Sequence, residues 1–315
     1  MTDTDAESLG IEVWRGCVNT WECDEMGHMN VRFYVVRALE GLVGLAAALG
    51  MPRAFSATAG ATLLIQDQHI RFLREAVAGA ALHMRGWVAE MGETEARLVQ
   101  VLYHASGEPA ASFQTVVSHR TPGEGRAFPW SDEARRRAEA LIAPIPDFAA
   151  ARSIDLSPVD SLASMARADA LDLVHLTSGA VMARDCDVFG RMSAEQFIGR
   201  VSDGIPGLVG RTRRAIVEAM PERPERVGGA VLEYRLVHLD WPRAGDRIEI
   251  RSGLVAVDHR TQRMIHWMLD PDSGRVWGVS EAVAVTLDLD KRKIVPVSPE
   301  AQAVLNASAV KGLTL

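Results

Sequence analysis

The sequence predicts an α+β protein of two tandem domains, each wrapping an antiparallel sheet around one long central helix. Three observations support this. The motif Cys-Asp-x-x-Gly-x-Met occurs twice, at residues 23–29 and 186–192. Apolar residues recur at helical spacing after each copy, and four strand-like segments follow each helix. One order of elements that occurs twice indicates two copies of one fold.

Length and charge set the frame for this interpretation. The 315 residues suggest about two domains, and we place them at residues 1–125 and 171–315 with a connector at 126–170. A net charge of −7 makes nucleic acid an improbable partner. Three cysteines and a polar N-terminus without an apolar core predict a reducing, cytoplasmic location. The apolar stretch 38–51 is too short to span a membrane and contains Glu40.

The expected elements follow one order in both halves. A strand precedes each motif (11–20 and 178–185), and a helix follows it. The first helix covers residues 31–50, and the second spans three to four turns and is expected to kink or end early at Pro206. The later strands are expected at 69–73, 81–90, 95–104 and 110–119, and again at 230–239, 246–257, 263–270 and 277–289. The connector is expected to hold one helix, 131–142, with Ser131 as its N-cap.

The first copy carries a longer motif set. Asp24-Glu25-Met26-Gly27-His28-Met29-Asn30 is followed by Tyr34 and Glu40 in the helix, then by His69-Ile70-Arg71-Phe72-Leu73-Arg74 and Ala78-Gly79. This set resembles the hotdog-fold thioesterase superfamily, in particular its 4-hydroxybenzoyl-CoA thioesterase-like and acyl-ACP thioesterase-like members in a tandem double-hotdog form.

The resemblance implies a catalytic role for the first motif. Asp24 would act on a thioester carbonyl as nucleophile or as general base, with His28 and Asn30 beside it. Backbone N–H groups near Gly27 and Val31, at the positive end of the helix, would stabilise the oxyanion. Three alternatives stay open: Asp24 could cap the helix, His28 could make a structural hydrogen bond, and Asn30 could only fix the loop.

The second copy departs from this pattern. Asp187 is retained, but Arg191 replaces His28, Ser193 replaces Asn30 and Phe197 replaces Tyr34. The second site is therefore expected either to be inactive or to anchor an anionic group through Arg191. Tyr34, Glu40 and Asp203 are pocket candidates, although the two carboxylates could instead pair with Arg37 and Arg200.

The predicted function is hydrolysis of an acyl thioester, with coenzyme A favoured over acyl carrier protein as the thiol carrier. No His-Glu-x-x-His pattern and no glycine-rich phosphate loop occurs, so neither a metal nor another cofactor is expected. The two copies would form an internal pseudo-dimer, with a homodimer of whole chains left open. The alternatives are an enoyl-thioester hydratase and a non-catalytic acyl-thioester binding module.

Overall fold

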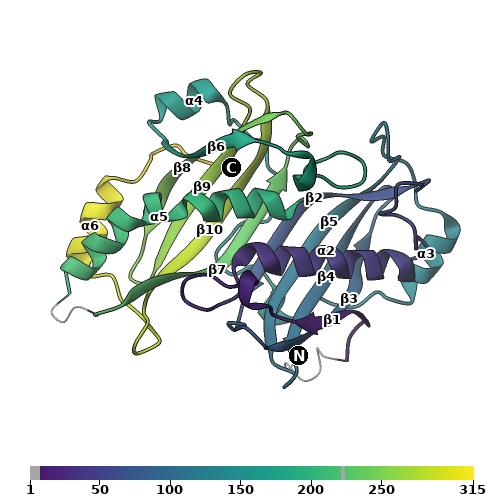
Figure 1. Ribbon diagram of the computed structural model, residues 1–315, viewed down its shortest axis with the longest axis horizontal. Helices are drawn as coiled ribbons and strands as arrows, with labels where there is room; N and C mark the ends of the chain where they lie inside the picture. Colours follow the sequence, from purple (N-terminus) through teal and green to yellow (C-terminus); the bar gives the residue numbers. More distant parts are fainter. Residues whose placement is uncertain (1–7, 221–223) are drawn as a thin grey trace. The chain divides into compact units, whose positions relative to one another are not determined.

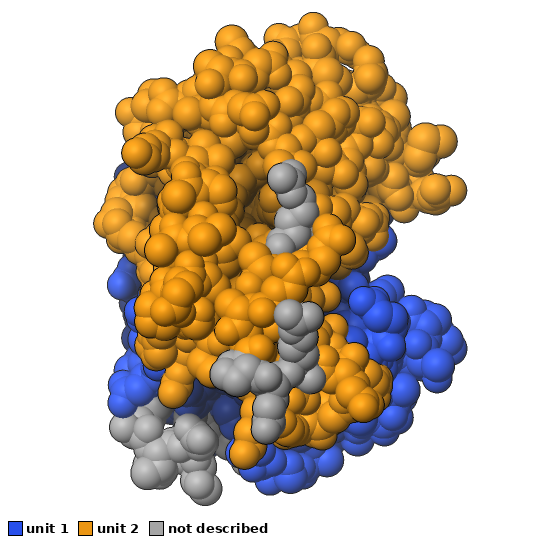
Figure 2. Space-filling model, turned by 90° about the vertical axis from the view of Figure 1, so that its left-hand side faces the viewer, with its two compact units in different colours: residues 1–152, 186–195 blue, residues 153–185, 196–315 orange. Residues whose placement is uncertain are grey.

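The computed structural model describes residues 8–220 and 224–315 (Figure 1). The chain divides into two compact units, coloured blue and orange in Figure 2. Unit 1 comprises residues 1–152 and 186–195, and unit 2 comprises residues 153–185 and 196–315. The second Cys-Asp motif therefore belongs to unit 1, although the strands that follow it belong to unit 2.

Unit 1 contains a five-stranded antiparallel sheet in the order β1-β3-β4-β5-β2. Its strands are β1 (Ile11–Cys17), β2 (Thr62–Phe72), β3 (Ala81–Met91), β4 (Glu95–His104) and β5 (Pro109–Arg120). The expected strands 81–90, 95–104 and 110–119 are confirmed. The strand expected at 69–73 begins at Thr62 instead, and residues 20–22 form a 3-10 turn, η1 (Thr20–Glu22), rather than the end of β1.

Helix α2 (Val31–Ala48) lies against the sheet of unit 1 (Figure 1). Its side chains Val35, Leu42 and Leu45 are fully buried or nearly so. The helix comes close because Gly44 has no side chain: a Cβ there would stand 2.5 Å from the carbonyl oxygen of Val13. Apolar burial and this close approach hold the C-terminal half of the helix against β1.

Unit 2 repeats the arrangement with the order β7-β10-β9-β8-β6, and β11 pairs with β10. The strands are β6 (Val174–Ala180), β7 (Val227–His238), β8 (Arg247–Val257), β9 (Thr261–Leu269), β10 (Val276–Asp288) and β11 (Lys293–Ile294). The strand expected at 178–185 is displaced, because residues 183–185 form the 3-10 turn η3 (Ala183–Asp185).

Helix α5 (Glu195–Glu218) corrects the expectation of an early end, because it continues through Pro206. Proline removes one backbone hydrogen bond and costs about 3 kcal/mol inside a helix. The side chains of Ile205, Leu208 and Val209, on both sides of the proline, pack against a core that includes Leu254. These side chains are partly buried, so each contributes less than the about 1.5–3 kcal/mol of a fully buried one, and together they offset that cost.

The segment between the two sheets holds more structure than expected. Ser131 caps α3 (Asp132–Glu139) as expected, its hydroxyl accepting from the Ala134 N–H at 3.2 Å. A second helix, α4 (Met165–Ala170), was not expected, because six residues are too few to show helical periodicity. The 3-10 turn η2 (Asp147–Ala149) and the late helix α6 (Pro299–Ala307) complete the described elements.

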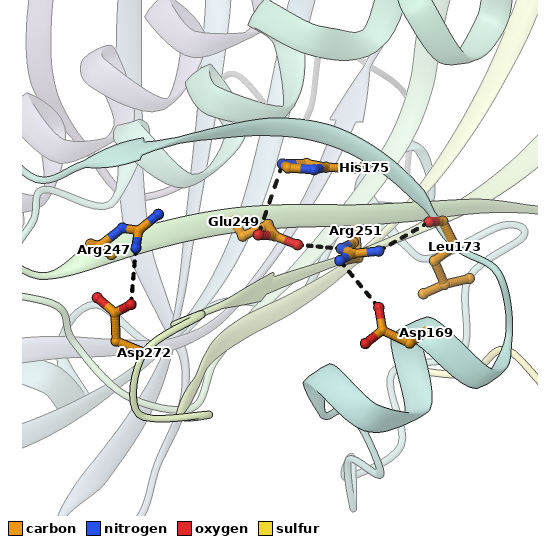
Figure 3. A network of polar contacts seen from close by, with 7 residues as sticks. All are labelled: Asp169, Leu173, His175, Arg247, Glu249, Arg251 and Asp272. Atoms are coloured by element: carbon orange, nitrogen blue, oxygen red, sulfur yellow. Dashed lines mark hydrogen bonds and ion pairs between the residues drawn. The ribbon is translucent and has the colours of Figure 1, made fainter.

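A polar network in unit 2 ties α4 and β6 to β8 (Figure 3). Arg251 of β8 contacts Glu249 on its own strand, Asp169 of α4 at 3.2 Å and the carbonyl of Leu173 at 3.5 Å. Glu249 also lies 3.9 Å from the ring of His175 on β6. These contacts attach the end of the connector to the edge of the sheet.

Candidate active site

Asp24 lies in a tight loop whose backbone is closed by its own hydrogen bonds. The Asp24 N–H donates to the carbonyl of His28 at 2.8 Å, and the Gly27 N–H donates to the carbonyl of Asp24 at 3.0 Å. Gly27 has φ +80°, a conformation that glycine adopts without strain. The carboxylate oxygen Oδ1 of Asp24 accepts from the N–H groups of Met26 (2.9 Å) and His28 (3.2 Å). Oδ1 is thus fixed by the loop, and these bonds leave Oδ2 unused.

Asn30 caps α2 directly after this loop. Its side chain accepts from the Arg32 N–H at 3.0 Å, and its carbonyl accepts from the Phe33 N–H at 2.9 Å. Neither acceptor takes the N–H of Val31, which lies between them in the first turn. Because the first N–H groups of a helix carry partial positive charge, the Val31 N–H is a suitable donor for a developing oxyanion. The structure thus shows Asn30 in a helix-capping role.

His28 pairs with a residue that the motif analysis missed. Its Nε2 lies 3.3 Å from Oε2 of Glu75, in the turn between β2 and β3. That turn is held against the loop, since the Met29 N–H donates to the Ala76 carbonyl at 2.7 Å and His28 bridges to Val77. The matched strand motif ends at Arg74, one residue before Glu75, and only the pairing of turn and loop reveals the contact.

Tyr34 contacts the same turn through its hydroxyl group. Its buried hydroxyl accepts from the Ala76 N–H at 3.2 Å, and its ring packs edge-on against Phe72 at 5.2 Å. Burial raises the pKa of Tyr34 to about 12, and the nearby charges of Glu75 and Asp24 act in the same direction. The hydroxyl therefore stays protonated and is anchored to the backbone.

The two carboxylates named as pocket candidates lie on exposed faces. Glu40 has a 46% exposed side chain and pairs with Arg37 at 2.8 Å. Arg37 also contacts the buried Glu22. Asp203 is exposed on α5, and Arg200 pairs with Asp185 at 3.3 Å. The ion pair expected for Glu40 is present, whereas the structure gives Arg200 a different acid from the one expected.

The second loop has the same backbone and a different electrostatic state. Asp187 exchanges backbone bonds with Arg191 and Gly190 as Asp24 does with His28 and Gly27, and its Oδ1 accepts from Phe189 (2.8 Å) and Arg191 (3.0 Å). Its Oδ2, however, lies 3.0 Å from Nη2 and 3.1 Å from Nε of Arg191. Arg191 is 7% exposed on its side chain and stacks over Phe189. Two guanidinium nitrogens of Arg191 therefore share Oδ2, the oxygen that the first loop leaves unused in Asp24.

The start of the second helix also differs. Asn30 directly precedes α2, but Ser193 stands two residues before α5 begins at Glu195. In each unit, two successive N–H groups at the end of a strand donate to one carbonyl (Leu73 and Arg74 to Ala110; Leu239 and Asp240 to Trp277). This match aligns Ala76 with Pro242, which has no N–H. The second copy therefore lacks both partners of the hydrogen bond between Tyr34 and Ala76. Phe197 has no hydroxyl in the place of Tyr34, and Pro242 has no N–H in the place of Ala76.

A family model described as the thioesterase-like superfamily matches residues 18–150 and 181–305. The chain belongs to the thioesterase-like superfamily. The match covers both copies, including both Asp loops, and it confirms the resemblance found in the motifs.

Solved structures confirm the α+β double-hotdog fold. The chain is similar to a Lactobacillus plantarum protein described as an oleoyl thioesterase, with 10% identity, TM-score 0.66, and 88% and 97% of the two chains covered. It is also similar to an acyl-ACP thioesterase of Bacteroides thetaiotaomicron, with 11% identity, TM-score 0.63, and 90% of this chain and 100% of that chain covered. The 12:0-ACP thioesterase of Umbellularia californica has 10% identity and TM-score 0.64, with 90% of this chain and 97% of that chain covered. No curated protein sequence matches.

No helix within residues 8–220 and 224–315 combines the length and apolarity needed to cross a bilayer. Over the same residues, no three His, Cys, Asp or Glu side chains gather as a metal-binding group.

Proposed function

We propose that this chain hydrolyses an acyl thioester at its first loop, with Asp24 as nucleophile or general base. The observation that carries the proposal is the contrast between the loops. Asp24 is oriented through Oδ1 while the loop leaves Oδ2 for chemistry, whereas Oδ2 of Asp187 is held by Arg191. A carboxylate held by a buried guanidinium is a poor base and a poor nucleophile, so the second loop serves structure.

Two routes fit the geometry. In the first, Oδ2 of Asp24 attacks the carbonyl carbon, the C–S bond breaks with its electron pair on sulfur, and water then cleaves the acyl-aspartate. In the second, Asp24 takes a proton from a water molecule whose oxygen attacks the carbonyl carbon, the C–S bond breaks with its electron pair on sulfur, and the proton passes to the leaving thiolate. Both develop negative charge on the carbonyl oxygen, which the Val31 N–H and the helix start stabilise.

His28 and Asn30 orient the acyl group or the water in this proposal. The carboxylate of Glu75 fixes the imidazole of His28, because a ring nitrogen that donates to a carboxylate holds one tautomer and one orientation. We expect Glu75→Gln to lower kcat by about tenfold to a hundredfold, and Glu75→Asp to retain more of it. Chromatography and melting temperature check that both variants fold.

For the thiol carrier we propose coenzyme A, with acyl carrier protein as the alternative. Two similar structures are described as acting on acyl carrier protein, but at 10–11% identity they support the fold and not the carrier. Octanoyl-CoA and octanoyl-acyl carrier protein should be compared by kcat/KM. A higher value for the protein-bound substrate would reverse the choice.

The deciding experiment is thiol release from short, branched, aromatic and long acyl-CoAs, measured beside hydration of crotonyl-CoA. A thioesterase releases thiol from at least one of them and leaves crotonyl-CoA unhydrated. Hydration without thiol release would indicate the hydratase, and binding without either reaction would indicate a binding module.

A further inference from the structure

Two histidines of unit 2 are buried with ring nitrogens that lack hydrogen-bond partners within the described chain. His238, at the end of β7, is 5% exposed, and neither Nδ1 nor Nε2 has a partner. His266, on β9, is 2% exposed; its Nδ1 lies 2.8 Å from the Ser252 hydroxyl, and its Nε2 has none. Burying polar groups in this state costs folding free energy, so these three nitrogens require an explanation.

Both histidines face α5. Met264 and Leu254 belong to the core that packs against α5, and alternate residues of a strand share a face, so His266 and Ser252 lie on the same side. In the register of the sheet, His266 stands between Ser252 and Ser280. His238 meets Phe197 of α5 edge-on at 4.4 Å.

Unit 1 forms the same fold with other side chains at these positions. The row Ser252–His266–Ser280 corresponds to Gly86–Gln100–Phe113 in unit 1, by the same register. There, Gln100 donates to the Ala38 carbonyl of α2 at 2.9 Å, and Phe113 is fully buried. The strand-end match described above also aligns His238 with Phe72. The fold therefore does not require either histidine.

The two histidine rings on the face of the sheet toward α5 favour an uncharged ligand. Burial lowers the pKa of both His238 and His266 to about 3, so both rings are neutral near pH 7. A neutral imidazole has one donor and one acceptor nitrogen, and a hydroxyl group can serve either. A charged ligand would find no opposite charge on these rings and would lose its hydration.

We propose that unit 2 binds, on the side of its sheet facing α5, an uncharged organic group with a hydroxyl among apolar atoms, held by His238 and His266. The proposal is independent of the reaction assigned to Asp24. The hydroxyl could belong to a free alcohol or phenol, or to a hydroxyacyl thioester.

The test uses phenol and toluene, which match in shape and differ in the hydroxyl. Histidine-selective ¹³C labelling reports binding to the full-length chain. Phenol should shift the ring signals of His238 and His266 and bind about tenfold or more tightly than toluene. His266→Gln and His238→Phe, which install the residues of unit 1, should each weaken phenol binding by about tenfold while the melting temperature holds or rises. His259→Gln, at an exposed histidine, is the control.

Displacement of phenol identifies the source of the hydroxyl. Displacement by 3-hydroxyoctanoyl-CoA but not by octanoyl-CoA indicates a hydroxyacyl group, and displacement by neither indicates a free alcohol or phenol. Equal binding of phenol and toluene, no binding of phenol, or unchanged phenol binding in both variants would overturn the proposal. Because binding is read without turnover, an absence of thiol release would refute the proposed hydrolysis and leave this test intact.

Discussion

Replacing Asp24 by Asn changes the charge of one side chain and retains the loop that holds it. The amide oxygen of Asn can still accept from the N–H groups of Met26 and His28. Hydrogen bonds to a charged acceptor contribute about 1.5–3 kcal/mol and neutral ones about 0.5–1.5, so the two weakened bonds together cost about 2 kcal/mol. At about 2–4 °C per kcal/mol, the melting temperature should fall by about 4–8 °C.

The effect on turnover should be far larger than the effect on stability. An amide has neither a nucleophilic nor a basic oxygen, so kcat should fall by about 10³-fold or more, equivalent to about 4 kcal/mol in the activation free energy. The assay is continuous thiol release at saturating acyl-CoA, beside calorimetry on the same preparation. A variant that keeps more than about a tenth of kcat would refute a chemical role for Asp24.

Asp187→Asn is the matched control because its loop has the same backbone bonds. It should leave kcat within about twofold, while the melting temperature falls further than for Asp24→Asn, because the buried Arg191 loses its carboxylate. Equal losses of kcat in the two variants would show that both loops act only through stability.

Three further predictions concern the cap of α2, the Tyr34 hydroxyl and the two buried histidines of unit 2. Asn30→Ala removes the cap of α2 and should cost about 1 kcal/mol, whereas Asn30→Ser should restore most of that stability by denaturant titration. Tyr34→Phe leaves the buried Ala76 N–H unpaired and should cost about 1–3 kcal/mol in the same assay. The folded-state pKa of His238 and His266 is about 3, below the unfolded value of 6.5. Their contribution to stability is therefore complete above pH 6.5 and lost as pH falls toward 3, by about 1.4 kcal/mol per pH unit each, and His266→Gln should flatten this slope.

The repeat and the architecture could be predicted from the sequence because both depend on local periodicity. The loop at Asp24, the helix from Val31 and the strands beside it follow from turn chemistry and apolar spacing. The length of α5 could not be predicted in this way, because packing on both sides of Pro206 outweighs the local helix-breaking preference of proline.

The candidate site was predictable only where its residues are neighbours in the chain. Asp24, His28 and Asn30 fall within seven residues and could be named together. Glu75 comes from a turn between distant strands, and its contact with His28 depends on how that turn meets the loop. Likewise, the pairing of Arg191 with Asp187 is a choice of side-chain conformation that residue types alone do not determine.

The two loops adopt the same backbone conformation and belong to one polypeptide. In an assembly of identical chains, a substitution would appear in every loop at once, and a change that silenced one carboxylate would silence all of them. Here Arg191 could arise opposite Asp187 while His28 stayed beside Asp24. Duplication within one chain thus allows the two copies to carry different side chains at the same position of one loop.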